Sequence, residues 1–330
     1  MSEQTKKTIL LTGATGFLGR QLTAYFLQQG NSFLRLVSRS KIEEKPDPKI
    51  TVLLSRPLSA ESNWYDALHG CDVVIHTAAR VHIMKDKADD PLHEFRKVNV
   101  EGTLNLARQA AHLGVKRFIF ISSIKVNGES TARNQTFLAD DLPQPLDAYG
   151  QSKYEAEQGL QHLAEETGME VVIIRPPLIY GPGVKGNFQR LMRCLQKGIP
   201  LPFGAITNKR SFVSINNLMS LIAICIEHPK AANQIFLVSD GEDLSTTDLL
   251  RKIGQAMNKP ARLLIIPQNI LHLLANLSGK KAIFQRVCGS LRVDISKTCE
   301  KLGWTPEMPV SEALNLMVKN YLLNQPQQEK

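Results

Sequence analysis

Short apolar runs alternate with longer amphipathic stretches through the first half of the chain. The runs have the length of buried strands and cover residues 8–12, 33–37, 50–54, 72–76, 117–121 and 171–174. Between them, apolar residues recur with helical spacing, as from Phe17 to Leu27, where Gly30 ends the helix, and over residues 91–113, where Gly114 ends it. Continuous apolar strands that alternate with helices predict an α/β fold with a doubly wound parallel sheet, buried on both faces.

The pattern changes after Arg175, which two prolines follow. Turn residues gather over 181–186, and helical stretches then dominate, with short strands expected near 211–213 and 235–238. We therefore predict a first domain over residues 1–176 and a smaller, mainly helical C-terminal domain over 177–330, which closes over the ligand. This division leaves room for later segments to return to the first domain.

The apolar segment 265–277 allows two interpretations. It includes Pro267, Gln268, Asn269 and His272, and it is too short and too polar to span a bilayer. Its apolar face could contact a membrane surface or a partner protein. Burial in the core of the C-terminal domain is the favoured interpretation.

Charge and cysteine content narrow the class of protein. The chain has 330 residues and a net charge of +9, but its Lys and Arg residues are scattered rather than clustered. This favours a solvated surface with an anionic small ligand over nucleic acid binding. The five cysteines form no C-x-x-C pair, which favours reduced thiols in the cytoplasm. The eight histidines match no metal spacing, and the polar N-terminus resembles no export signal, so we expect neither a metal nor an integral membrane span.

A glycine-rich loop joins the first predicted strand to the first helix. It has the spacing G-x-x-G-x-x-G at Gly13, Gly16 and Gly19. The first glycine permits a tight turn, the second lets the backbone approach a pyrophosphate, and the third lets the helix pack close to the sheet. The strand–turn–helix context predicts a Rossmann-like dinucleotide site, with the pyrophosphate at the helix N-terminus.

The residues after the second strand bear on the choice of cofactor. A site that prefers NAD places an acidic side chain there, against the ribose hydroxyls. This chain has Arg39 and Lys41 instead, and Arg39 could bind a 2′-phosphate. The prediction is therefore that NADP(H) is preferred, with NAD(H) still possible.

Ser123, Tyr149 and Lys153 form the predicted catalytic set. Tyr149 and Lys153 are four residues apart, so they share one face of a helix. A nearby ammonium favours the phenolate and should lower the pKa of the phenol. Ser123, at the end of a predicted strand, would hydrogen-bond the reacting oxygen, while Tyr149 exchanges its proton.

Five further residues are candidates to bind substrate. Asn187 follows a glycine-rich loop and opens a helix, and Arg210 could reach an anionic group. Lys125 lies two residues after Ser123. Arg286 is a candidate in the C-terminal region, as is Arg292.

These pieces together resemble the extended short-chain dehydrogenase/reductases of the NAD-dependent epimerase/dehydratase family. The resemblance spans nearly the whole chain and rests on segments 12–19, 72–79, 99–103, 122–128, 149–153, 175–183, 210–213 and 293–306. It implies a nucleotide-sugar site in the C-terminal domain, a homodimer, and an organising role for Asn99. It also implies further cofactor contacts at Thr15, Phe17, Leu18, Ala78, Ala79 and Pro176.

Two departures affect the choice of reaction. Asn127 and Lys125 stand where many UDP-hexose C4 epimerases have tyrosine and threonine, and segment 123–128 is instead similar to UDP-N-acetylquinovosamine reductases. The favoured hypothesis is an NAD(P)H-dependent reduction of the C4 ketone of a UDP-4-keto-6-deoxy-N-acetylhexosamine, in surface polysaccharide (O-antigen) synthesis. The alternative is a C4 epimerase of a UDP-hexose or UDP-N-acetylhexosamine that retains NAD. A third hypothesis is a non-catalytic NADP-binding sensor, which would not need Tyr149 and Lys153.

Overall fold

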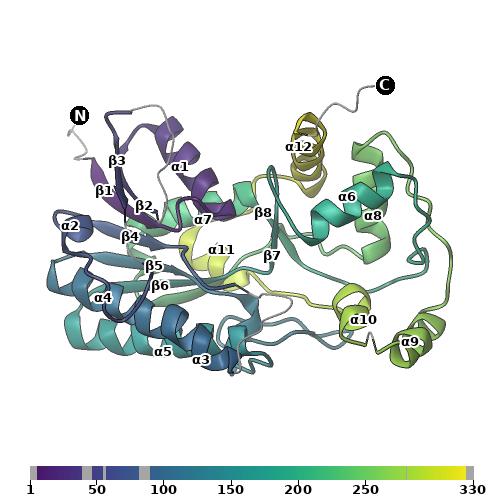
Figure 1. Ribbon diagram of the computed structural model, residues 1–330, viewed down its shortest axis with the longest axis horizontal. Helices are drawn as coiled ribbons and strands as arrows, with labels where there is room; N and C mark the ends of the chain where they lie inside the picture. Colours follow the sequence, from purple (N-terminus) through teal and green to yellow (C-terminus); the bar gives the residue numbers. More distant parts are fainter. Residues whose placement is uncertain (1–5, 39–46, 55–56, 82–89, 280, 325–330) are drawn as a thin grey trace.

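A seven-stranded parallel sheet forms the centre of the N-terminal part of the protein (Figure 1). The computed structural model describes residues 6–38, 47–54, 57–81, 90–279 and 281–324. The strand order is β3-β2-β1-β4-β5-β6-β9, and every neighbouring pair is parallel. The strands are β1 (Lys7–Thr12), β2 (Ser32–Ser38), β3 (Ile50–Leu54), β4 (Val73–His76), β5 (Arg117–Ile121), β6 (Glu170–Arg175) and β9 (Gln234–Leu237). The predicted α/β, Rossmann-like doubly wound sheet is confirmed.

Helices cover both faces of this sheet, as its continuously apolar strands require. One face packs against α1 (Phe17–Gln29), α7 (Ile215–Glu227) and α11 (Ser296–Leu302). The other face packs against α2 (Tyr65–Leu68), α4 (Thr103–His112) and α5 (Ala148–Thr167). Gly30 ends α1 in the left-handed conformation, with φ of 71°, as its position after the helical pattern predicts.

The chain crosses between the two parts of the molecule more than once. Residues 177–233 first form β7 (Leu178–Tyr180), α6 (Asn187–Gln196), β8 (Phe212–Ser214), α7 and the short η3 (Pro229–Ala231). Strands β7 and β8 pair with each other in a separate two-stranded sheet. Strand β9 then returns to the large sheet and pairs with β6. Segments beyond residue 176 therefore supply one strand, β9, to the large sheet and two helices, α7 and α11, that cover one of its faces.

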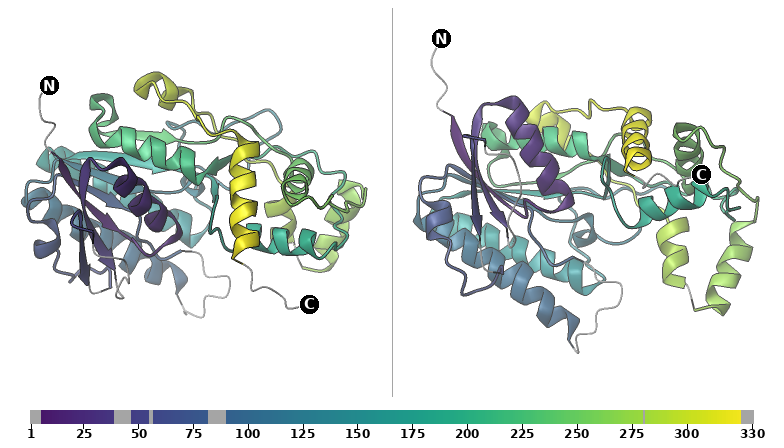
Figure 2. Two further views of the ribbon diagram at one scale, coloured as in Figure 1. Left: turned by 90° about the horizontal axis from the view of Figure 1, so that it is seen from above. Right: turned by 45° about the horizontal axis from the view of Figure 1, so that its top comes forward.

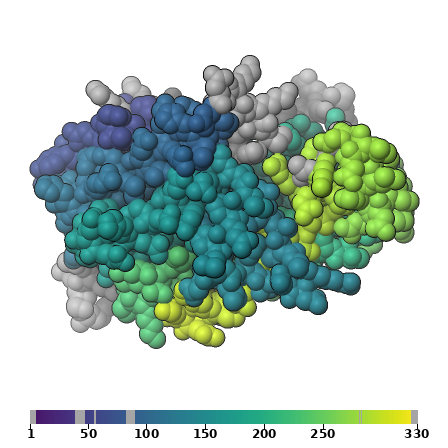
Figure 3. Space-filling model, turned by 90° about the horizontal axis from the view of Figure 1, so that it is seen from below, coloured from purple at the N-terminus to yellow at the C-terminus, as the bar shows by residue number. Residues whose placement is uncertain are grey.

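The C-terminal part is mainly helical and has its own core. It contains α6, α8 (Thr246–Ala256), α9 (Gln268–Leu277), α10 (Lys281–Cys288) and α12 (Val310–Leu323). Side chains of α6, α8 and α12 pack around Phe188, Leu250 and Leu314. Helices α9 and α10 lie at the end of the molecule farthest from the large sheet (Figure 2). In the space-filling view they form most of the lobe at one edge (Figure 3).

One predicted helix differs in detail. The helix expected over 91–113 is built from α3 (Pro91–Phe95), a π-helical segment η1 (Arg96–Gly102) and α4. A π segment widens the helix locally and is frequent at functional sites. Here it contains Asn99, whose contacts are described below.

Candidate active site

The carboxyl ends of β1, β4 and β5 meet at one edge of the sheet. Thr12 pairs with His76, and His76 pairs with Phe120, so the segments that follow these strands start side by side. These segments are the glycine loop, the stretch with Ala78 and Ala79, and the stretch with Ser123. Ligands of open α/β sheets bind at this edge.

The glycine loop has a geometry that only glycine accommodates. Gly13 has φ of 71°, and a Cβ there would lie 2.6 Å from Oγ1 of Thr77. A Cβ on Gly19 would lie 2.1 Å from the carbonyl oxygen of Gly13. Gly16 is the N-cap of α1, so no cap side chain covers the first N–H groups of the helix. The loop thus fits a dinucleotide, whose pyrophosphate these N–H groups and the helix dipole would hold.

The other predicted cofactor residues differ in how they could contribute. Thr15 is exposed, Phe17 is half-buried, and Leu18 is buried in the core, which leaves Leu18 mainly its backbone for a cofactor contact. The N–H of Ala78 lies 3.4 Å from Oγ1 of Thr12, and neighbouring Ala79 is half-buried.

Pro176 is buried, and its carbonyl accepts a hydrogen bond of 3.0 Å from the N–H of Ile124. Arg39 lies outside the described residues. The cofactor contacts of all these residues stay predictions.

Helix α5 and the end of β5 bring the predicted catalytic residues to one region. Tyr149 lies in the first turn of α5, and Lys153 lies one turn later. The ammonium of Lys153 donates a 2.8 Å hydrogen bond to the carbonyl of Ile121, two residues before Ser123. Ser123 caps the short helix η2 (Ile124–Val126), and its Oγ accepts from the N–H of Lys125 at 3.2 Å. These positions suit the predicted roles, which the geometry alone does not test.

The charges at this site differ from the expected arrangement. Burial is the main cause that raises the pKa of the Tyr149 phenol well above its usual value, and the carboxylate of Asp147 raises it further. Burial lowers the pKa of Lys153 to about 7, against an opposing effect from Glu157. The predicted lowering of the phenol pKa by Lys153 is therefore wrong for this structure, because desolvation disfavours the charged form of both groups.

Lys153 should make the stability of the protein depend on pH. In the folded protein, Lys153 releases its proton near pH 7, whereas the ordinary lysine pKa is 10.5. Between these pH values the folded state therefore binds fewer protons than the unfolded chain. The contribution of this group to stability therefore rises with pH across that window. We expect Lys153→Met to raise the free energy of unfolding by about 2 kcal/mol at pH 7, and by less at pH 9.5.

Urea unfolding at both pH values would measure this difference. Lys97→Met, which removes an exposed lysine, is the control and should show no such dependence on pH. A gap between Lys153→Met and wild type that stays constant from pH 7 to pH 9.5 would contradict the low pKa of Lys153.

His76 is a structural residue at this edge. Its ring is fully buried, stacks on Phe120 and has hydrogen-bond partners in Thr12 at 2.7 Å and Thr103 at 3.0 Å. Burial lowers its pKa to about 3. The ring of His76 therefore stays neutral, and it fixes the last residue of β1 and the first residue of α4 to β4.

Asn99 connects the π segment to the start of α5. Its carboxamide accepts from the N–H of Arg80 at 2.8 Å and donates to the carbonyl of Arg80 at 3.0 Å. It also donates to Oγ of Ser152, which in turn donates to the carbonyl of Tyr149 at 2.8 Å. The segment after β4 is thus fixed to the turn of α5 that presents Tyr149.

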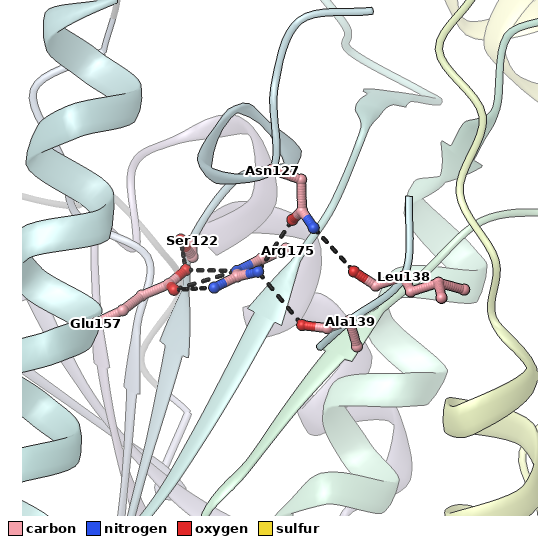
Figure 4. Close-up of polar contacts among 6 residues, drawn as sticks. All are labelled: Ser122, Asn127, Leu138, Ala139, Glu157 and Arg175. Carbon is pink, nitrogen blue, oxygen red and sulfur yellow. Dashed lines mark hydrogen bonds and ion pairs between the residues drawn. The ribbon is translucent and has the colours of Figure 1, made fainter. Parts of the chain in front are cut away.

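A buried ion pair joins α5 to the end of β6 (Figure 4). The guanidinium of Arg175, at the end of β6, donates to both carboxylate oxygens of Glu157 on α5, with a shortest distance of 2.5 Å. The two side chains are 2% and 1% exposed. Ser122 donates a short hydrogen bond to the same carboxylate. The sequence analysis missed this pair, although a charged residue that ends an apolar strand indicates a buried partner.

Asn127 belongs to the same network. Its side-chain oxygen accepts from Arg175 at 3.0 Å, and its side-chain nitrogen donates to the carbonyl of Leu138 at 2.9 Å. The residue is buried. The identity of Asn127, one of the two departures that favoured a reductase, is therefore explained by this internal network rather than by an open site.

The predicted substrate residues have unequal settings. Arg210 is half-buried, burial lowers its pKa, and its guanidinium donates to the carbonyl of Gly289 at 3.0 Å. A desolvated cation of this kind suits an anionic ligand. Asn187 is exposed in the first turn of α6, and Arg286 is exposed on α10.

Lys125 and Arg292 are paired within the protein. Lys125 contacts the carboxylates of Asp147 and, at 3.0 Å, Glu129. Arg292 contacts Asp243 at 2.7 Å. A substrate contact by Lys125 would have to compete with these two carboxylates.

No metal centre or membrane span is evident in the described part of the chain. Those residues include no group of three His, Cys, Asp or Glu side chains suited to a metal ion. Among the same residues, none of the helices has the length and apolar character needed to cross a bilayer.

Known proteins with similar sequences and folds share this architecture. The sequence model of the NAD dependent epimerase/dehydratase family matches residues 9–239. A UDP-glucose 4-epimerase of Vibrio cholerae is 48% identical, with 96% of both chains covered. An N-acetyl-alpha-D-glucosaminyl-diphospho-ditrans,octacis-undecaprenol 4-epimerase of Escherichia coli O157:H7 is 27% identical, with 93% of both covered. The UDP-glucuronic acid 4-epimerase of Bacillus cereus, solved with NAD, has the same fold at 22% identity and a TM-score of 0.77, covering 95% of this chain and 96% of that one.

Proposed function

Because this chain belongs to the NAD dependent epimerase/dehydratase family and is therefore a nucleotide-sugar enzyme of the short-chain dehydrogenase type, we propose that it epimerises C4 of a UDP-hexose or UDP-N-acetylhexosamine and retains NAD(H). The observation that supports this most strongly is the 48% identity to the Vibrio cholerae 4-epimerase over 96% of both chains. The sequence analysis gave this function as its alternative.

The two departures that favoured a reductase have internal partners in this structure. Asn127 serves a buried network, and Lys125 contacts the carboxylates of Asp147 and Glu129. The family description and the solved neighbour both refer to NAD. We therefore propose NAD(H) as the cofactor.

The residues at the sheet edge would perform distinct tasks in this reaction. The bound dinucleotide supplies the hydride acceptor and donor. Tyr149 would act as the phenolate that takes the proton of the C4 hydroxyl as the ketone forms, and the resulting phenol would return that proton as the alcohol is restored, while Ser123 would orient the oxygen. Lys153 lies one helical turn from Tyr149, and it would hold the ribose of the nicotinamide.

Substrate would bind between the two parts of the molecule. The desolvated guanidinium of Arg210 is proposed to pair with the diphosphate, with Asn187 and Arg286 as further contacts. After the oxidation, rotation of the 4-keto sugar would present its other face to the reduced cofactor, and the hydride would return to C4. Net cofactor consumption is therefore zero. A homodimer, a cytoplasmic location and a role in surface polysaccharide synthesis stay predictions of this proposal.

The test is product formation from single nucleotide sugars. The purified protein should convert UDP-glucose or UDP-N-acetylglucosamine to the C4 epimer, detected by proton NMR, with at most catalytic NAD and no steady change in nicotinamide absorbance. A UDP-4-keto-6-deoxy-N-acetylhexosamine with NADPH is the comparison substrate. Stoichiometric NADPH oxidation with that ketone, together with no epimer from either nucleotide sugar, would overturn the proposal in favour of the reductase.

A second substrate class shares the same C4 chemistry. The Escherichia coli relative is named for a sugar linked through diphosphate to undecaprenol. The exposed apolar side chains of α9, described below, favour testing such a lipid-linked N-acetylglucosamine in the same panel. Epimerisation of that compound alone would assign the lipid-linked sugar as substrate in place of the UDP-sugar.

A further inference from the structure

Helix α9 presents its apolar side chains to solvent. Ile270, Leu273, Leu274 and Leu277 are 50%, 58%, 54% and 78% exposed. Their spacing of three and four residues places them on one stripe of the helix. α9 contains no buried residue, so the expected burial of segment 265–277 in the core is wrong. The amphipathic pattern exists, but its apolar stripe is directed outward.

Neighbouring segments extend this apolar surface. Ile265, just before α9, is 81% exposed, and Ile283 on α10 is 58% exposed. None of these side chains belongs to the hydrophobic cores of the described residues. We call Ile265, Ile283 and the α9 stripe the apolar surface of the hairpin. Single exposed leucines are ordinary, but four exposed apolar side chains on one stripe of a short helix indicate an interaction site.

The hairpin formed by α9 and α10 has a fixed orientation. The rings of His272 and Phe284 meet edge to face with centroids 5.1 Å apart and join the two helices. At the base, the carbonyl of Val287 accepts from Oγ1 of Thr246 at 2.5 Å. The side chain of Asn208 donates to the carbonyl of Gly289 at 2.8 Å. The apolar surface is therefore held by the C-terminal core and is not a loose tail.

The sequence of the hairpin and its flanks is basic, although the cations at 251, 252 and 292 pair with carboxylates outside this stretch. Residues 249–293 include no Asp or Glu but eight Lys and Arg residues, at 251, 252, 259, 262, 280, 281, 286 and 292. The whole chain has a net charge of +9. An apolar stripe on a short helix with basic residues nearby matches the chemistry of an anionic lipid surface.

We propose that the α9–α10 hairpin docks on an anionic phospholipid bilayer, with the apolar surface of the hairpin inserted at the interface. The helices have 10 and 8 residues, so they lie on the bilayer and do not cross it. A second copy of this chain fits less well, because pairing two such surfaces would oppose like charges.

Vesicle flotation of the full-length protein tests this proposal without any catalytic step. Wild-type protein should float with vesicles of phosphatidylglycerol and phosphatidylcholine, and not with pure phosphatidylcholine. The double variant Leu273→Glu/Leu277→Glu should reduce the bound fraction about tenfold or more, because two exposed apolar anchors are lost. Leu323→Glu, which changes a leucine of α12 that is 74% exposed, is the control and should float like wild type.

Two further measurements exclude trivial outcomes. Far-UV circular dichroism should show that the double variant melts at the temperature of wild type, since both leucines are exposed. Epimerisation of a soluble nucleotide sugar by the double variant should also stay at the wild-type rate, so a failure of this proposal is separable from a failure of the proposed reaction.

Absence of wild-type binding to the anionic vesicles, or equal binding by the double variant, would overturn the proposal. A wild-type dimer in light scattering that the double variant abolishes, without vesicle binding, would assign the surface to a second copy instead.

Discussion

Tyr149→Phe should reduce turnover by about 10³-fold while leaving NAD binding within about twofold of wild type. The substitution removes only the phenolic oxygen, and the ring would keep its edge contact with Phe95, with centroids 6.0 Å apart. Because Tyr149 is the proposed proton acceptor and donor, loss of its hydroxyl should act on the chemical step. Single-turnover formation of the C4 epimer and titration of NAD by fluorescence would measure the two effects separately.

Tyr154→Phe is the matched control for this experiment. Tyr154 lies on the same helix, adjacent to Lys153, and is half-buried. It should retain wild-type turnover. If Tyr149→Phe also kept full turnover, the proposed proton transfer by Tyr149 would be excluded, and another group would have to exchange the proton of the C4 hydroxyl.

Arg175→Met should lower the free energy of unfolding by about 3–5 kcal/mol, the largest stability effect that we expect from a single substitution here. The change leaves the carboxylate of Glu157 buried at 1% exposure without the guanidinium that contacts both of its oxygens. It also removes the donor that faces Asn127 at 3.0 Å. Urea denaturation followed by circular dichroism would measure the loss.

The double variant Glu157→Leu/Arg175→Met distinguishes the cost of an unpaired charge from the value of the pair. Replacing both partners by apolar groups is often close to neutral, so the double variant should be more stable than Arg175→Met alone. Glu155→Ala is a control on the same helix, where the partner Arg96 is 45% exposed, and it should change stability far less. If Arg175→Met had no greater effect than Glu155→Ala, the buried pair would not be a main support of the sheet edge.

The succession of strands and helices along the N-terminal half of the chain could be predicted, because each strand is short, apolar and followed by a recognisable turn. Gly30 and the glycine loop at Gly13 mark their elements through backbone conformations that other residues do not favour. The π segment around Asn99 could not be predicted, since it depends on contacts with Arg80 and Ser152, distant in the chain. Periodicity alone identified that region as helix and no more.

In the candidate site, too, the sequence predicted some features and missed others. The motif spacing placed Tyr149 and Lys153 on one helix and Ser123 at a strand end, as the structure has them. Burial was the missing information. It reverses the expected electrostatics of Tyr149 and Lys153, and it shows that the stripe on α9 faces outward although its period would suit a core helix.

The late arrival of β9 has a consequence for synthesis of the chain. When β6 leaves the ribosome, β5 is available to pair on one side, but its partner on the other side, residues 234–237, has not yet emerged. The nascent polypeptide therefore exposes an apolar edge, Val171 to Ile174, for the time needed to translate almost sixty more codons. Such an edge is a template for aggregation, so this interval is when the growing protein would depend most on chaperones.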